Sequence, residues 1–89
     1  MAWALTQFNA SGAVKTGTGY VQAVVLTPAA AAATLELRDG GAADTVVLTL
    51  KAVANGDSRG AFFPSAAELP KGIYVTLAGV GALASISYR

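Results

Sequence analysis

The sequence predicts an all-β protein: a small antiparallel β-sandwich or barrel of about six to seven short strands. Several segments alternate apolar and polar residues, which is the period of a half-buried strand. Turn formers such as Gly, Asn, Asp and Pro separate these segments at short intervals. The chain has 89 residues, enough for a single domain, which we place at residues 13–89.

The first two strands of this domain are expected at residues 20–27 and 34–38. The earlier segment is rich in the β-branched and aromatic residues that favour strands. In the later one, Leu35 and Leu37 alternate with polar residues and so face one side. The alanines at residues 29–33 favour helix by propensity, but five are too few for a stable helix. A loop or a single turn is therefore expected between the two strands.

Residues 45–53 are expected to return beside residues 34–38 as an antiparallel hairpin. They show the same alternation, with three residues facing one side: Val46, Leu48 and Leu50. The segment between the two runs, residues 39–44, consists of turn-forming residues.

Another turn is expected at residues 55–57, followed by a short strand at residues 58–63. That strand is expected to end at Pro64, because proline has no N–H to donate to a strand ladder. Residues 65–72 are then a connection that could include one helical turn.

The last two central strands are expected at residues 73–77 and 82–88, with a turn at residues 78–81. Residues 13–16 could add an edge strand. The strands at 20–27, 73–77 and 82–88 contain no charged residue, which marks them as either the partner surface or the deepest core.

The first twelve residues leave two interpretations open. Trp3, Leu5 and Phe8 follow a crude strand pattern, so residues 1–12 could form the first strand of the sandwich. They could also form an extended N-terminal arm that docks its aromatic residue on a neighbouring subunit, because Trp is a common anchor at interfaces.

The composition predicts that much of the surface is covered by another protein. Charged residues make up 12% of the chain, against about a quarter in an average soluble domain. Twenty residues are alanine, which buries little area, and the chain has no cysteine or histidine to provide a disulfide or a zinc site. Small domains with such thin cores usually need a partner chain. We therefore expect a homo-oligomer, and a trimer is a plausible number of subunits.

The same composition argues against an enzyme and against a bound cofactor or metal. Nucleophilic catalysis usually needs a histidine base, and the chain has none. A calcium site at Asp39 and Asp44 lacks the full acidic loop pattern. Gly79 to Ala84 match a dinucleotide-binding fingerprint, but a strand is expected after them instead of the required helix. We therefore expect no catalytic residues, no cofactor and no metal.

Nucleic-acid and membrane partners are not expected either. The six Lys and Arg residues are spread singly along the chain and do not form a cluster. The longest apolar run, residues 21–33, is interrupted by polar residues and too short to span a bilayer.

Exposed aromatic and apolar residues are the candidates for an interface. These are Trp3, Leu5, Phe8, Tyr20, Tyr74 and Tyr88. The tyrosines are expected to pack as strand residues with their hydroxyls at the rim. The alternative is that Trp3 and the tyrosines stack on sugar rings, as in a carbohydrate-binding adhesion module.

Five segments together resemble a known group of proteins. They are residues 19–27 (GYVQAVVLT), 33–40 (ATLELRDG), 62–64 (FFP), 69–77 (LPKGIYVTL) and 86–89 (ISYR). This arrangement, which spans roughly residues 13–89, resembles the small β-sandwich virion proteins of tailed bacteriophages and related particles. The resemblance implies a capsid decoration or cement subunit, or else a head-spike, fibre or tail-associated subunit. It further implies contact with the major capsid protein or other virion proteins, and a location in the virion after assembly in the host cytoplasm.

Overall fold

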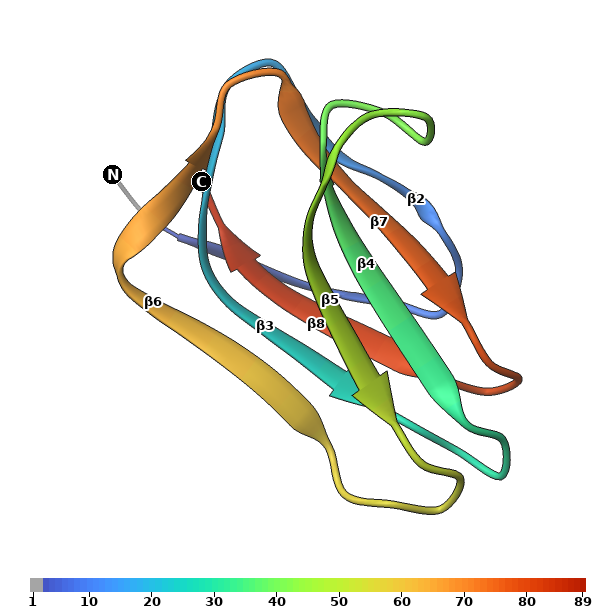
Figure 1. The fold of residues 1–89 in the computed structure, drawn as a ribbon. Coiled ribbons are helices and arrows are strands. Elements are labelled where there is room, and N and C mark those ends of the chain that lie inside the picture. Colours follow the sequence, from blue (N-terminus) through green and yellow to red (C-terminus); the bar gives the residue numbers. More distant parts are fainter. Residues whose placement is uncertain (1–2) are drawn as a thin grey trace.

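The computed structural model describes residues 3–89, which form two four-stranded antiparallel sheets packed face to face (Figure 1). The strands are β1 (Ala4–Phe8), β2 (Gly12–Thr16), β3 (Gly19–Thr27), β4 (Ala33–Asp39), β5 (Val46–Ala52), β6 (Arg59–Leu69), β7 (Gly72–Ala78) and β8 (Leu83–Tyr88). Sheet A has the order β1-β8-β3-β6 and sheet B the order β2-β7-β4-β5. The all-β class is confirmed, and the architecture is a sandwich. The described chain has one strand more than the expected six to seven, because Ala4–Phe8 pairs with β8 as an edge strand.

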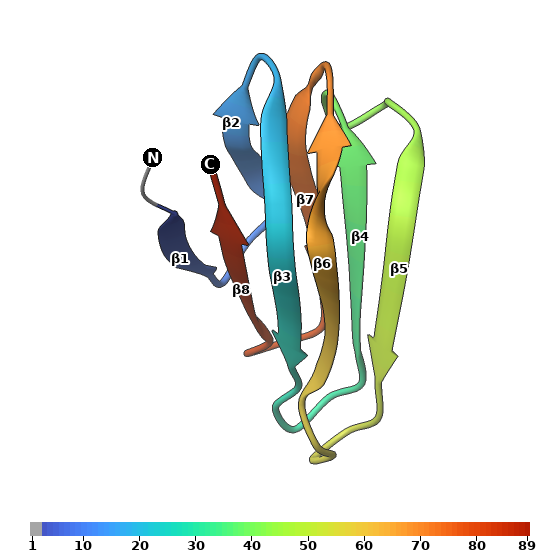
Figure 2. The ribbon, with the colours of Figure 1, turned by 90° about the vertical axis from the view of Figure 1, so that its left-hand side faces the viewer.

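Most connections carry the chain from one sheet to the other. Among the described residues, β4 and β5 alone are consecutive strands that pair with each other, with Leu35 opposite Leu50 and Leu37 opposite Leu48. The predicted hairpin is therefore confirmed, but the prediction that Val46 shares the side of Leu48 and Leu50 is wrong, because a register shift places Val46 opposite Arg38 and leaves it exposed. In contrast, β7 and β8 follow one another through the expected turn but lie in different sheets (Figure 2).

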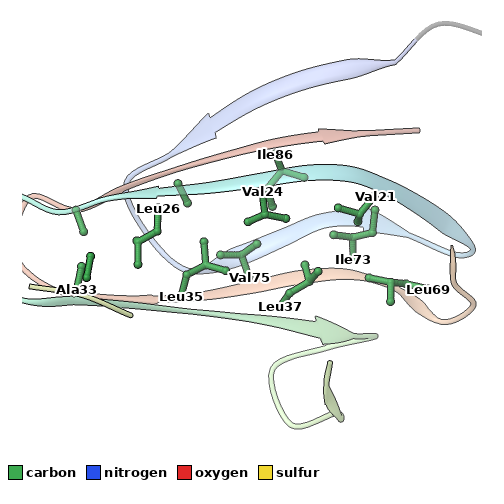
Figure 3. Packing of buried hydrophobic residues seen from close by; sticks show 13 residues of the cluster. Val21, Val24, Leu26, Ala33, Leu35, Leu37, Leu69, Ile73, Val75 and Ile86 are labelled. Carbon is green, nitrogen blue, oxygen red and sulfur yellow. The ribbon is translucent and has the colours of Figure 1, made fainter. Parts of the chain in front are cut away.

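The core lies between the two sheets and is made of aliphatic residues from both (Figure 3). Its largest fully buried side chains are Leu26, Leu35, Leu37, Ile73, Ile86, Val21, Val24 and Val75. Six of these eight come from the three strands that carry no charge, β3, β7 and β8. One side of each uncharged strand is therefore core, and only their other sides remain for a partner.

A β-bulge in β3 allows two parts of this strand to face the core. Val21 pairs with Tyr88 and Ala23 with Ser87, so Gln22 is an extra residue relative to β8. Val21 and Val24 are three residues apart, yet both are fully buried. A regular strand would turn one of them outward because its side chains alternate. The bulge therefore explains how this strand fills the core along its whole length.

The expected end of the sixth strand at Pro64 is wrong. β6 continues to Leu69, which is buried in the core, and residues 65–69 contain no helical turn. The strand can pass through the proline because it is an edge strand and because Pro64 lies in an irregular stretch. On β3, Ala23 pairs with Phe62 and Val21 with Ala67, so residues 63–66 of β6 bulge out opposite Gln22. Pro64 lies in this bulge and does not need to donate a ladder hydrogen bond.

The link from β6 to β7 turns at Gly72, and this position requires glycine. Its φ is +138°, a conformation that residues with a Cβ rarely adopt. A Cβ there would also lie 2.8 Å from the backbone oxygen of Lys15 on β2. The close approach of β2 and β7 therefore depends on this glycine.

Candidate interaction surface

The outer face of sheet B is polar and carries an ion-paired network. The Arg38 guanidinium donates hydrogen bonds to Glu36 Oε1 at 2.8 Å, to Thr76 Oγ1 at 3.0 Å and to the backbone oxygen of Asp44 at 2.9 Å. Lys51 lies on the same face, opposite Thr34. The predicted solvent side of the β4–β5 hairpin is thus the outer face of sheet B.

The outer face of sheet A has a different character. The pairing of its four strands places residues of neighbouring strands side by side, in rows that run across the sheet. The middle row consists of Leu5, Ser87, Ala23 and Phe62. The two residues at the ends of this row, Leu5 and Phe62, are 76% and 65% exposed, and the two between them are small. We call this set the apolar row. It places two large exposed hydrophobic side chains at the edges, and between them Ser87 Oγ donates a hydrogen bond to Gln22 Oε1 at 3.1 Å.

The neighbouring row contains no charge either. It consists of Gln7, Ser85, Val25 and Gly60. Val25 is 38% exposed, which is high for a valine on a central strand. Two consecutive rows of sheet A are thus uncharged and partly apolar.

The charges on this face are confined to its end row, where Trp3, Arg89, Tyr20 and Glu68 meet. The Arg89 guanidinium lies 4.8 Å from the Trp3 ring centre and 5.4 Å from that of Tyr20, both within the range of a cation–π contact. Arg89 and Tyr20 also exchange two backbone hydrogen bonds, and the Tyr20 hydroxyl donates to Glu68 at 3.3 Å. One cation and one anion are thus held at the same end of the sheet.

The structure brings three of the six candidate interface residues together. Trp3, Leu5 and Tyr20 lie on the outer face of sheet A. Phe8 and Tyr88 instead pack against the core from its rim. The sixth candidate, Tyr74, lies on sheet B opposite Arg38.

Sequence reasoning missed Phe62, Val25, Arg89 and Glu68 as members of this face. The doublet Phe62-Phe63 gives a usable signal for the first, since neighbouring residues on a strand point to opposite sides. Phe63 packs against the core, which leaves Phe62 outside. No comparable signal exists for Arg89, because its contact with Trp3 joins the two ends of the chain.

The acidic turn residues have structural partners. Asp39 Oδ1 accepts a hydrogen bond from the Lys71 backbone N–H at 3.0 Å, and Asp44 Oδ2 accepts one from Gly41 N–H at 2.6 Å. Within residues 3–89, no three His, Cys, Asp or Glu side chains come together in a way that could hold a metal ion. No helix in this part of the chain could span a membrane by its length and hydropathy.

A hollow of about 320 Å³ lies along the bulged part of β6. It is lined by Phe63, Pro64, Ser65, Ala66 and Ala67. All five come from one stretch of one strand, and none of their side chains titrates. Binding sites usually combine an apolar lining with several converging polar groups, which this hollow lacks.

Three exposed large hydrophobic residues, Leu5, Val25 and Phe62, therefore lie on the outer face of sheet A, whereas Val46 and Val47 are exposed on the edge strand β5 of sheet B, where Val46 lies opposite Arg38. Comparison of the chain with protein-family models, with curated proteins and with solved structures gave no match.

Proposed function

We propose that this chain is a non-enzymatic structural subunit that buries the outer face of sheet A against another protein of an assembly. The observation that carries the proposal is the apolar row together with its uncharged neighbour. Leu5 and Phe62 project from opposite edges of a face whose central residues carry no charge. Exposed apolar surface bordered by polar residues is typical of interaction sites.

The contrast between the two faces supports this assignment. Sheet B presents Glu36, Arg38 and Lys51 to solvent, and burying such groups would cost their hydration. Two rows of sheet A present no charge and so avoid that cost. Apolar burial stabilises by about 25 cal/mol per Å², which becomes substantial when one contact is repeated many times in an assembly.

The specific role we propose is a capsid decoration or cement subunit. Its partners would be the major capsid protein or other virion proteins, and its location the assembled virion. The resemblance of the strand and turn segments to small β-sandwich virion proteins supports this choice. A spike, fibre or tail-associated subunit would use the same surface.

A sugar-binding module fits the structure less well. Such a module needs free aromatic faces on which a sugar ring can stack, but Arg89 already lies against the rings of both Trp3 and Tyr20. Tyr88 packs at the rim of the core, which leaves Tyr74 on the opposite sheet.

Mass spectrometry and cryo-electron microscopy of particles purified from the source of the gene test this function. We expect the chain at a fixed ratio to the shell protein, with the outer face of sheet A in contact with a neighbour. Leu5→Lys should lower its occupancy on the particles, whereas Val47→Lys on β5, at a residue 48% exposed, should not. Particles that lack the chain would contradict the virion role.

A further inference from the structure

We infer that the partner on the outer face of sheet A is a second copy of this chain, packed sheet to sheet around a two-fold axis. The axis runs parallel to the strands, between β8 and β3. This inference rests on the proposed function, because it names a second copy as the neighbour that buries this face in the assembly, and the shell protein would then contact the pair through other surfaces.

The size of the face suits a stable dimer. The molecule measures 35 × 26 × 17 Å, and its two stacked sheets account for the short dimension. The broadest outline of the molecule is thus 35 × 26 Å, on the order of 900 Å². This outline is an upper limit for the area that one face can bury, and each partner of a typical stable interface buries about 800 Å². The dimer therefore has to use most of the outer face of sheet A.

The apolar row is self-complementary under this axis. The rotation exchanges the two edge strands, so β1 of one copy lies over β6 of the other, and β8 lies over β3. Leu5 then meets the second copy's Phe62, and Ser87 meets the second copy's Ala23. Large apolar side chains thus meet at both edges of the dimer, and the small residues of the two centres face each other.

The neighbouring row pairs side chains of different size. Under the same rotation Gln7 lies over the second copy's Gly60, and Val25 lies over the second copy's Ser85. Large side chains thus face small ones, as in the interdigitated layers of a β-sandwich core. Stacked sheets usually keep their strands within about 30° of each other, which shifts these pairs by about one residue at the edges.

Charge favours a second copy over a strongly charged partner. Among the side chains of residues 3–89 on this face, Arg89 is the cation and Glu68 the anion, and both lie in its end row. The rotation places Arg89 over the second copy's Tyr20 and Glu68 over the second copy's Trp3, so like charges do not meet. A partner with a large net charge would not be complementary to this face, because the face has no cluster of opposite charge.

Sedimentation equilibrium of the purified wild-type chain and of matched variants tests the inference. We expect a dimer for the wild type and for the control Val80→Lys, which lies 84% exposed in the turn between β7 and β8. Leu5→Lys and Phe62→Glu each place an unpaired charge at both edges of the dimer. Each should raise the dissociation constant by on the order of 30-fold or more, the loss typical of a hot-spot residue. Circular dichroism checks that both variants remain folded.

Mixing the two variants tests the direction of the axis. In a heterodimer of Leu5→Lys with Phe62→Glu, one edge joins the introduced ammonium to the introduced carboxylate, and the other edge keeps the wild-type contact. We therefore expect the mixture to dimerise more tightly than either variant alone. An axis perpendicular to the strands would place Leu5 over its own equivalent, so the heterodimer would contain neither the ammonium–carboxylate contact nor an intact wild-type edge, and it would not approach the affinity of the wild type.

A monomeric wild type, a trimer, or a dimer that both variants leave intact would overturn the inference. These outcomes are separate from failure of the proposed function. If the wild type is a monomer and Leu5→Lys still lowers its occupancy on particles, the outer face of sheet A is an assembly surface, but its partner is not a second copy. A monomer that binds particles equally well with and without this substitution would contradict both.

Discussion

Replacing Leu35 by alanine is expected to lower the free energy of unfolding by about 2–5 kcal/mol. Leu35 is fully buried on β4, between Leu50 of β5 and Leu77 of β7 in the register of sheet B. The substitution removes apolar contacts and leaves a cavity that the sheets can close only in part. Because small domains are stable by only about 5–15 kcal/mol, the loss is a large share of the total.

Urea denaturation followed by circular dichroism measures this effect. The variant and the wild type should be compared at one protein concentration, since association adds to apparent stability. Val80→Ala is the control, because Val80 is 84% exposed in a turn. It should change the free energy of unfolding by no more than about 0.5 kcal/mol. Equal effects of the two substitutions would contradict the placement of Leu35 in the core.

Deleting Gln22 and Ala23 together is the second change with a large expected effect. Gln22 is the extra residue of the β3 bulge, and without it the strand returns to regular alternation with Val21 and Val24 on one face. Removing Ala23 as well makes Val21 and Val24 neighbours, and neighbouring residues on a strand point to opposite faces. Either part of the strand would expose a valine that is now fully buried, and Tyr20 would be turned toward the core. We expect a loss of about 3 kcal/mol or more, enough to unfold much of the population.

The matched control is the deletion of Gln22 alone. It removes the extra residue and one hydrogen bond, from Ser87 Oγ to Gln22 Oε1 at 3.1 Å, but leaves Val21 and Val24 two residues apart and so on the same face. It should cost about 1 kcal/mol. Thermal unfolding and an amide NMR spectrum compare the two proteins. If the double deletion were no more destabilising than the single one, the alternation of β3 would not decide which residues face the core.

The β4–β5 hairpin could be predicted because all its determinants are local. Alternating leucines fix the buried side of each strand, and turn residues join them over a short distance. The inward positions of Ile73, Val75 and Ile86 follow from the same alternation. In these elements the hydrophobic pattern and the turn chemistry agree.

The distribution of strands between the sheets could not be predicted in this way. A short turn such as residues 78–81 can reverse the chain within one sheet or carry it to the other, and its composition is the same in both cases. The end of β6 was mispredicted for a related reason. Proline stops a central strand, but whether Pro64 lies on an edge depends on pairings made elsewhere in the sheet.

The interaction surface depends on long-range register and was therefore only partly visible in the sequence. The apolar row joins Leu5, Ser87, Ala23 and Phe62 from four strands that are far apart along the chain. Low charge in β3 and β8 indicated that something covers these strands. The structure divides the two sides of each strand between the core and the outer face of sheet A.

Methyl NMR of the assembled protein with a soluble paramagnetic probe tests most directly whether the outer face of sheet A is an assembly surface. The probe weakens signals from exposed methyl groups, and the residues to compare are Leu5 and Val25 with Val47 and Val80. All four are exposed in the isolated chain. The account predicts that assembly protects Leu5 and Val25 and leaves Val47 and Val80 as accessible as before. Protection of Val47 with continued exposure of Leu5 and Val25 would contradict it.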